Sequence, residues 1–166
     1  MSGQGENRRS PEERAERQAR TSAARVYAVQ ALFQMEAASQ TADRVMAEFR
    51  NWRIGRVDED PDMVSVEADE KLFTRIINGV VNWQSRIDQM TDRALVAKWP
   101  IDRIDPVLRA LFRAAGAELV EKGAPPRVVI TEYVRICQAF FPDGRESKFV
   151  NAVLDHMAHE ARPEDF

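Results

Sequence analysis

Cysteine is almost absent from the sequence: Cys137 is the one thiol, so no disulfide can form within the chain. Proteins of oxidising compartments commonly rely on disulfides, and we therefore expect a reducing compartment. No apolar run approaches the roughly 20 residues of a membrane helix, and residues 1–20 lack the apolar centre of a secretory signal. These absences predict a cytoplasmic protein that does not enter the membrane.

Glycine and proline are also scarce, with seven and eight copies among 166 residues. An all-β fold needs more turn residues than this, and alternating strand patterns are rare in the sequence. Residues that favour helices, such as Ala, Leu, Arg, Glu and Gln, are plentiful. The composition therefore predicts an all-α fold.

Motifs that carry catalysis are missing too. The sequence has no glycine-rich phosphate loop, no nucleophile elbow and no Cys/His set at zinc spacing. Cys137 lies on the apolar stripe of a predicted helix, as expected of a structural thiol. His156 and His159 stand three residues apart without a third ligand, so we expect a solvated face there. These observations predict neither enzyme activity nor a bound metal or cofactor.

The net charge of −3 conceals an uneven distribution. Residues 1–25 hold six arginines and four glutamates, whereas residues 56–70 hold seven acidic residues and one arginine. The acidic segment lacks the ligand spacing of a calcium loop, and its role stays open. Because salt screens distant charges, a local basic surface can bind an anion on an acidic protein.

Apolar residues recur at helical spacing along most of the chain, between an N-terminal tail at 1–9, expected to be disordered, and Pro163. A bend is expected near Gln84, a close helix contact at Gly79, and a division between residues 10–66 and 67–162. We expect six to seven helices, the main ones over residues 10–38, 41–53, 67–98, 105–122, 126–141 and 143–162.

Capping residues support several of these boundaries. Ser10 before Pro11 is typical of a helix start, and so is Asp105 before Pro106. Thr41, and Asp143 with Glu146 three residues later, predict two further N-caps. Gly123 is expected to end the helix before it in a left-handed conformation.

Two groups of residues are candidates for binding. Arg14, Arg17, Thr21 and Arg25 form one helical stripe, with Arg20 beside it. The stripe is either a solvated face, with Glu13 and Arg17 paired, or a phosphate-binding surface. Lys148 and Phe149 open the last helix; Phe149 is either a core residue or an aromatic that stacks on an unpaired base.

Two segments resemble the signatures of one family. "ARVYAVQALFQME" (24–36) is similar to the first-helix signature of the NusB transcription antitermination factors. "RVVITEYVRICQAFFPDGRESKFVNAVLD" (127–155) resembles their C-terminal signature, of which the KFVN-VLD element is the most specific part. The segments 72–88 and 111–119 resemble the middle helices, so the resemblance covers nearly the whole chain in order.

The resemblance implies a NusB-like fold of two small helical bundles without catalysis. It implies binding of boxA RNA together with the ribosomal protein NusE, as part of a transcription elongation complex on ribosomal RNA operons. Carried over by position, the RNA-binding residues are Arg17, Arg20, Arg25, Arg103, Arg113, Lys148 and Phe149. On this basis, replacing Arg25 or Lys148 by Ala is expected to weaken RNA binding with little loss of stability.

The sequence departs from the family pattern at several positions. Thr21, Ser22 and Ala23 stand where the family often has arginines, and Arg145 replaces a usual Asp. Leu108 stands where an acidic residue often faces NusE, so no NusE contact is carried over. The alternatives are a non-catalytic helical adaptor or homodimer, related to the NusB-like domain of ribosomal RNA cytosine methyltransferases.

Overall fold

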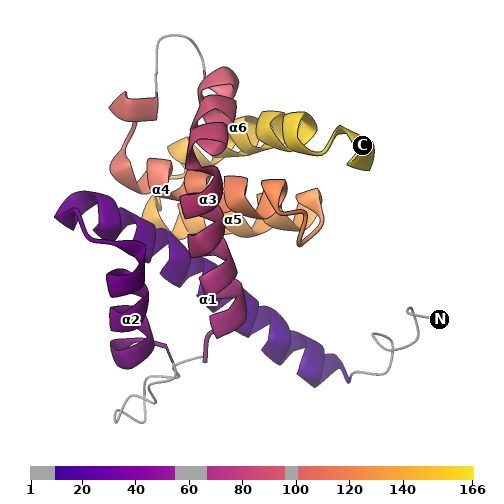
Figure 1. Cartoon of the computed structure of the whole chain (residues 1–166). Helices are drawn as coiled ribbons and strands as arrows, with labels where there is room; N and C mark the ends of the chain where they lie inside the picture. The colour runs from indigo at the N-terminus through magenta and orange to yellow at the C-terminus, as the bar shows by residue number, and fades with distance from the viewer. Residues whose placement is uncertain (1–9, 55–66, 96–100) are drawn as a thin grey trace.

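The computed structural model describes residues 10–54, 67–95 and 101–166, and within these ranges the chain is all-α, as predicted. The predicted tail at 1–9 and nearly all of the acidic segment lie outside the described residues. Figure 1 shows the arrangement. The helices are α1 (Pro11–Ala38), α2 (Ala42–Trp52), α3 (Glu70–Ala94), α4 (Pro106–Val120), α5 (Pro126–Phe140) and α6 (Arg145–Ala161), with short 3-10 turns at Ile101–Arg103 and Pro163–Asp165.

Side-chain caps start three of these helices, α1, α2 and α4, where the sequence predicts them. The Ser10 hydroxyl accepts a hydrogen bond from the Glu13 amide at 3.2 Å, and Thr41 caps α2 in the same way. The Asp105 carboxylate accepts from the Val107 amide at 2.8 Å, next to Pro106 in the first helical position. Each cap satisfies an amide that the helix itself leaves without a partner.

Two predicted helix ends are wrong. Asp143 does not cap α6; Gly144 holds the cap position with φ +74°, a conformation in which glycine has no Cβ to clash. After α4, the left-handed residue is Lys122 (φ 55°) and not Gly123. Gly123 serves a different need, because a Cβ there would lie 3.1 Å from Nη2 of Arg75.

Helix α3 bends where the sequence predicts a bend. Trp83 has non-helical angles (φ −124°, ψ 17°), one residue before the expected position. The helix ends at Ala94, earlier than predicted. Helix α3 packs against α4, which lies behind it in Figure 1.

Helix α4 is the centre of the fold, since it packs against α1, α3, α5 and α6. It is apolar on nearly all sides, as a helix enclosed by others must be. Small residues allow α3 to approach closely. A Cβ on Gly116 would lie 2.4 Å from Ile87 Cγ2, and one on Gly79 would lie 3.1 Å from the Ala117 Cβ. The close contact predicted at Gly79 is therefore confirmed.

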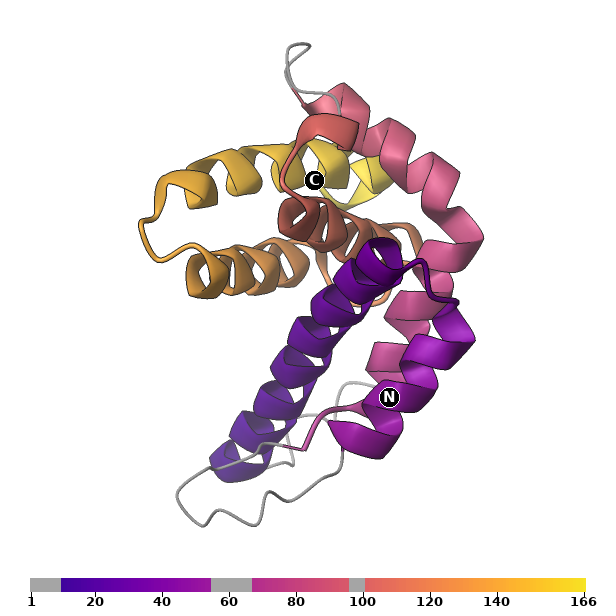
Figure 2. The same cartoon turned by 90° about the vertical axis from the view of Figure 1, so that its left-hand side faces the viewer.

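The described helices share one hydrophobic core, to which α1 contributes Ala24, Ala28, Val29 and Leu32. Helix α2 packs against α1 and α3, while α5 and α6 form an antiparallel pair on the far side of α4 (Figure 2). The predicted division near residue 66 falls outside the described residues and stays a prediction.

Arg25 is the main departure from the sequence interpretation. Its side chain is buried, with 5% of the residue exposed. The guanidinium donates two hydrogen bonds to the Glu118 carboxylate, at 2.9 and 3.0 Å, and Nη1 lies 3.9 Å from Glu132. Ser22 donates a further hydrogen bond to Glu132 at 2.8 Å. Arg25 thus joins α1 to α4 and α5, and is not the surface residue that the sequence suggested.

The two carboxylates keep Arg25 charged. Burial alone would lower the pKa of the guanidinium, but the hydrogen bonds and charge of Glu118 outweigh this effect and raise the pKa. Removing the cation would leave Glu118 buried without its counter-charge, whereas Glu132 would keep Arg135 at 3.6 Å. Breaking one side of such a buried pair is far more costly than losing an exposed pair.

We predict that Arg25→Met lowers the free energy of unfolding by about 3–5 kcal/mol, the usual effect of leaving a buried charge unpaired. The matched control is Arg20→Met on the exposed face of the same helix, which should change stability by less than about 0.5 kcal/mol. Urea denaturation followed by circular dichroism measures both. Equal stability of the two variants would contradict the structural role of Arg25.

Candidate nucleic-acid interface

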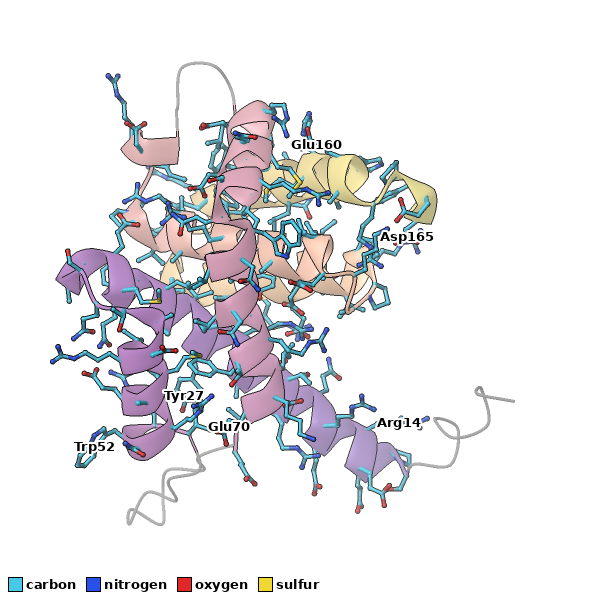
Figure 3. The ribbon with its side chains drawn as sticks, in the orientation of Figure 1. Arg14, Tyr27, Trp52, Glu70, Glu160 and Asp165 are labelled. Atoms are coloured by element: carbon cyan, nitrogen blue, oxygen red, sulfur yellow. The ribbon has the colours of Figure 1, made fainter. Side chains whose placement is uncertain are left out.

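The front half of α1 carries three exposed arginines: Arg14, Arg17 and Arg20. Within the described residues, none of their guanidinium groups has a hydrogen bond or an ion pair, and the predicted pair of Glu13 and Arg17 does not form. This half of the helix extends away from the other helices in Figure 1, and Arg14 points outward in Figure 3. The three cations are therefore available to an external anion.

Arg17 and Arg20 also share a surface hollow of about 330 Å³, with Glu13, Glu16 and Asp69 on its walls. Thr21 is not part of this surface, because its hydroxyl donates to the Gln18 carbonyl of its own helix at 2.9 Å.

Lys148 and Phe149 lie at the start of α6. Lys148 is exposed, while Phe149 is half-buried and meets the Phe112 ring edge to face, with centroids 6.3 Å apart. Phe149 thus lies at the edge of the core, between the two alternatives that the sequence left open. In Figure 2 the start of α6 lies at the upper left of the molecule and the start of α1 at its lower end.

The remaining candidates differ from each other. Arg103 is exposed in its 3-10 turn, whereas Arg113 is half-buried and bound on two sides. Arg113 donates to both oxygens of Asp88, at 3.1 and 3.0 Å, and to Glu36 at 3.1 Å. Arg109, one turn away, also binds Glu36. Arg113 therefore holds α4 against α1 and α3, and its guanidinium is already bound by carboxylates of the protein.

This cluster was not anticipated from the sequence. Arg109 and Arg113 are visible as an i,i+4 pair, but their acidic partners lie on two other helices. The hydrogen bond from Arg109, followed by the charges of both arginines, lowers the pKa of Glu36. The Glu36 carboxylate therefore stays charged and continues to neutralise Arg109 and Arg113.

The residues considered for other chemistry are structural or exposed. Cys137 is fully buried, and burial raises the pKa of its thiol to about 11, so it stays protonated and unreactive. The Nδ1–H of His159 donates to the Asp155 carbonyl oxygen (2.8 Å), and the His159 ring stacks on Phe166. Across the described residues, His, Cys, Asp and Glu form no group of three placed to hold a metal.

None of the described helices combines the length and the hydropathy that a bilayer-spanning segment requires.

Comparison with known proteins gives consistent matches along the chain. The model of the NusB family matches residues 22–159. A relative from Maricaulis maris (strain MCS10), named transcription antitermination protein NusB, is 44% identical over 161 residues, which cover 96% of this chain and 98% of the relative.

Solved structures agree with this match. T. maritima NusB has a TM-score of 0.67 and 30% identity, over 87% of this chain and 95% of that one. A crystal structure of the antitermination factors NusB and NusE in complex with double-stranded RNA has a TM-score of 0.68 over 84% of this chain and 96% of the other. At 22% identity, that second likeness concerns the fold. The family model and the full-length relatives show that the chain belongs to the NusB family.

Proposed function

We propose that this protein is a non-enzymatic RNA-binding adaptor that acts in transcription antitermination. The observation that carries the proposal is the set of exposed arginines on α1, which have no partner within the described residues. Relatives at 44% identity bear the name transcription antitermination protein NusB. Because it acts on transcription, we propose that the protein works in the cytoplasm.

The proposed RNA surface consists of Arg17, Arg20, Lys148, Phe149 and Arg103. The cations contact backbone phosphates, and the part of the Phe149 ring left exposed at the edge of the core stacks on an unpaired base. The ligand is single-stranded RNA of the boxA type, because splayed bases can reach such an edge while paired bases cannot.

Arg25 and Arg113 act differently in this proposal. Carboxylates inside the protein already bind both guanidinium groups. The two arginines therefore position α1 and α4, and they are not the first residues to bind a phosphate. Their effect on RNA binding passes through the orientation of the helix that carries Arg17 and Arg20. Loss of Arg25 should therefore act first on the stability of the fold, and only through the fold on the affinity for RNA.

A few phosphate contacts and one stacked base make a small interface. We therefore propose that tight binding needs a second protein surface, supplied by NusE, and that the pair joins the transcription elongation complex. A solved structure of NusB and NusE in complex with double-stranded RNA supports the pairing of the two proteins for the family member it contains.

Charge removal tests the RNA surface. We predict that Arg17→Ala with Arg20→Ala, and separately Lys148→Ala, weaken binding of boxA RNA by about tenfold for each charge-assisted hydrogen bond removed, near 1.4 kcal/mol. In these variants, the slope of log K for RNA binding against log salt concentration should become shallower by ~0.7 for each phosphate contact that is lost. Fluorescence anisotropy across a salt series measures both quantities.

The control is Arg44→Ala, which removes a cation from α2 whose side chain is 70% exposed. It should leave the affinity unchanged. If Arg44→Ala weakened binding as much as Lys148→Ala, RNA would be responding to overall charge and not to the proposed surface.

The need for a partner gives a second prediction. Adding NusE should increase the affinity for boxA RNA by at least about tenfold, because the partner adds contacts while the RNA is already ordered on the first protein. Anisotropy of labelled RNA titrated with this protein, with and without NusE, measures the gain. No gain with NusE would contradict the adaptor role, and sedimentation would then distinguish a homodimer from a monomer.

A further inference from the structure

A second basic site lies on another side of α1, in a cleft of about 540 Å³. Its walls come from the front half of α1, the start of α3, the end of α4 and the turn between α4 and α5. The volume is within the range of ligand sites, about 300–1,000 Å³. Several charged side chains line the cleft, so it suits a charged ligand better than an apolar one.

Three cations line the cleft: Arg17, Lys71 and Arg75. All three are exposed, and within the described residues none has a hydrogen bond or an ion pair. Arg25 and Glu118 also line the cleft, and their opposite charges cancel because the two side chains form an ion pair. The cleft therefore presents three cations that no hydrogen bond or ion pair within the described residues neutralises.

The remaining acidic groups of the cleft already accept hydrogen bonds from the protein. Asp69 caps α3 by accepting from the Leu72 amide at 3.1 Å, and Glu121 accepts from the indole N–H of Trp83 at 2.9 Å. Even with both counted, the cations outnumber the acids in the cleft by one. The local charge is positive on a protein whose net charge is −3.

The frame of the cleft is rigid. The Asp69 amide donates to the Arg20 carbonyl at 3.0 Å, which fixes the start of α3 to α1. The Arg75 guanidinium lies against Gly123, where a Cβ would come within 3.1 Å of Nη2. The absence of a side chain at Gly123 therefore leaves room for Arg75 at the rim.

Arg17 connects this cleft with the RNA surface. It lines both the cleft and the neighbouring hollow that it shares with Arg20. An RNA strand that contacts the two arginines of the hollow, whose walls also hold three acidic residues, can therefore continue through Arg17 to the cations of the cleft.

We propose that the cleft binds a backbone phosphate of RNA that flanks the segment held by α1 and α6, with Lys71 and Arg75 as the phosphate ligands. This inference rests on the proposed function. It assigns the RNA a path around the front half of α1, so that sequence-independent contacts to the flank add to the binding of boxA. Arginine supplies a bidentate fork for the phosphate, and lysine a point charge.

The test compares two RNAs: a boxA core, and the same core with a short unstructured flank at either end. The wild-type protein should bind the better of the flanked RNAs several-fold more tightly than the core, with a salt slope steeper by about 0.7 for the one phosphate held in the cleft. Lys71→Ala with Arg75→Ala should abolish this gain and keep the affinity for the core. The charge-conserving pair Lys71→Arg with Arg75→Lys should retain most of the gain.

The matched control removes two exposed cations elsewhere, Arg44→Ala with Arg93→Ala, and should keep the full gain. The inference is overturned if neither flank strengthens wild-type binding, if the Lys71/Arg75 double variant keeps the gain, or if the control pair loses it equally. Failure of the wild-type protein to bind the core is a different result, because it overturns the proposed function itself. Thermal unfolding of each variant verifies that these exposed substitutions leave the fold intact.

Discussion

The fold depends on one buried guanidinium. Arg25 connects α1 to Glu118 of α4 and Glu132 of α5, and these contacts set the direction in which the front half of α1 leaves the core. Such an ion pair adds little net stability compared with apolar packing, but it is costly to break. It therefore acts as a positional constraint: α1 must enter the bundle in the register that brings Arg25 to both carboxylates.

The constraint divides the basic residues of the chain into two kinds. Arg25 and Arg113 are neutralised inside the protein and hold helices together. Arg17, Arg20 and Lys148 remain exposed, and within the described residues they meet no carboxylate partner. The first kind makes the surface rigid, and the second kind makes it attractive to phosphate. Rigid placement of cations lowers the ordering cost of binding a flexible strand.

Much of the fold could be predicted because its signals are local. Apolar periodicity and caps such as Ser10 and Asp105 locate the helices, since each depends on residues within one turn. The left-handed end at Lys122 was missed because glycine is the usual residue in that conformation, and Gly123 stands next to it. The burial of Arg25 was missed because it depends on tertiary packing: its partner Glu118 is 93 residues away in sequence, and spacing along a helix cannot reveal a contact across helices.

The central claim is that RNA binds to the start of α1 and the start of α6, and amide hydrogen exchange tests it most directly. The exchange is measured on the complex with NusE, with and without boxA RNA, so that protection by NusE cancels. The account predicts RNA-dependent protection within residues 10–23 and 144–150, with little change in α2. Protection confined to α2, or absent from both helix starts, would contradict it.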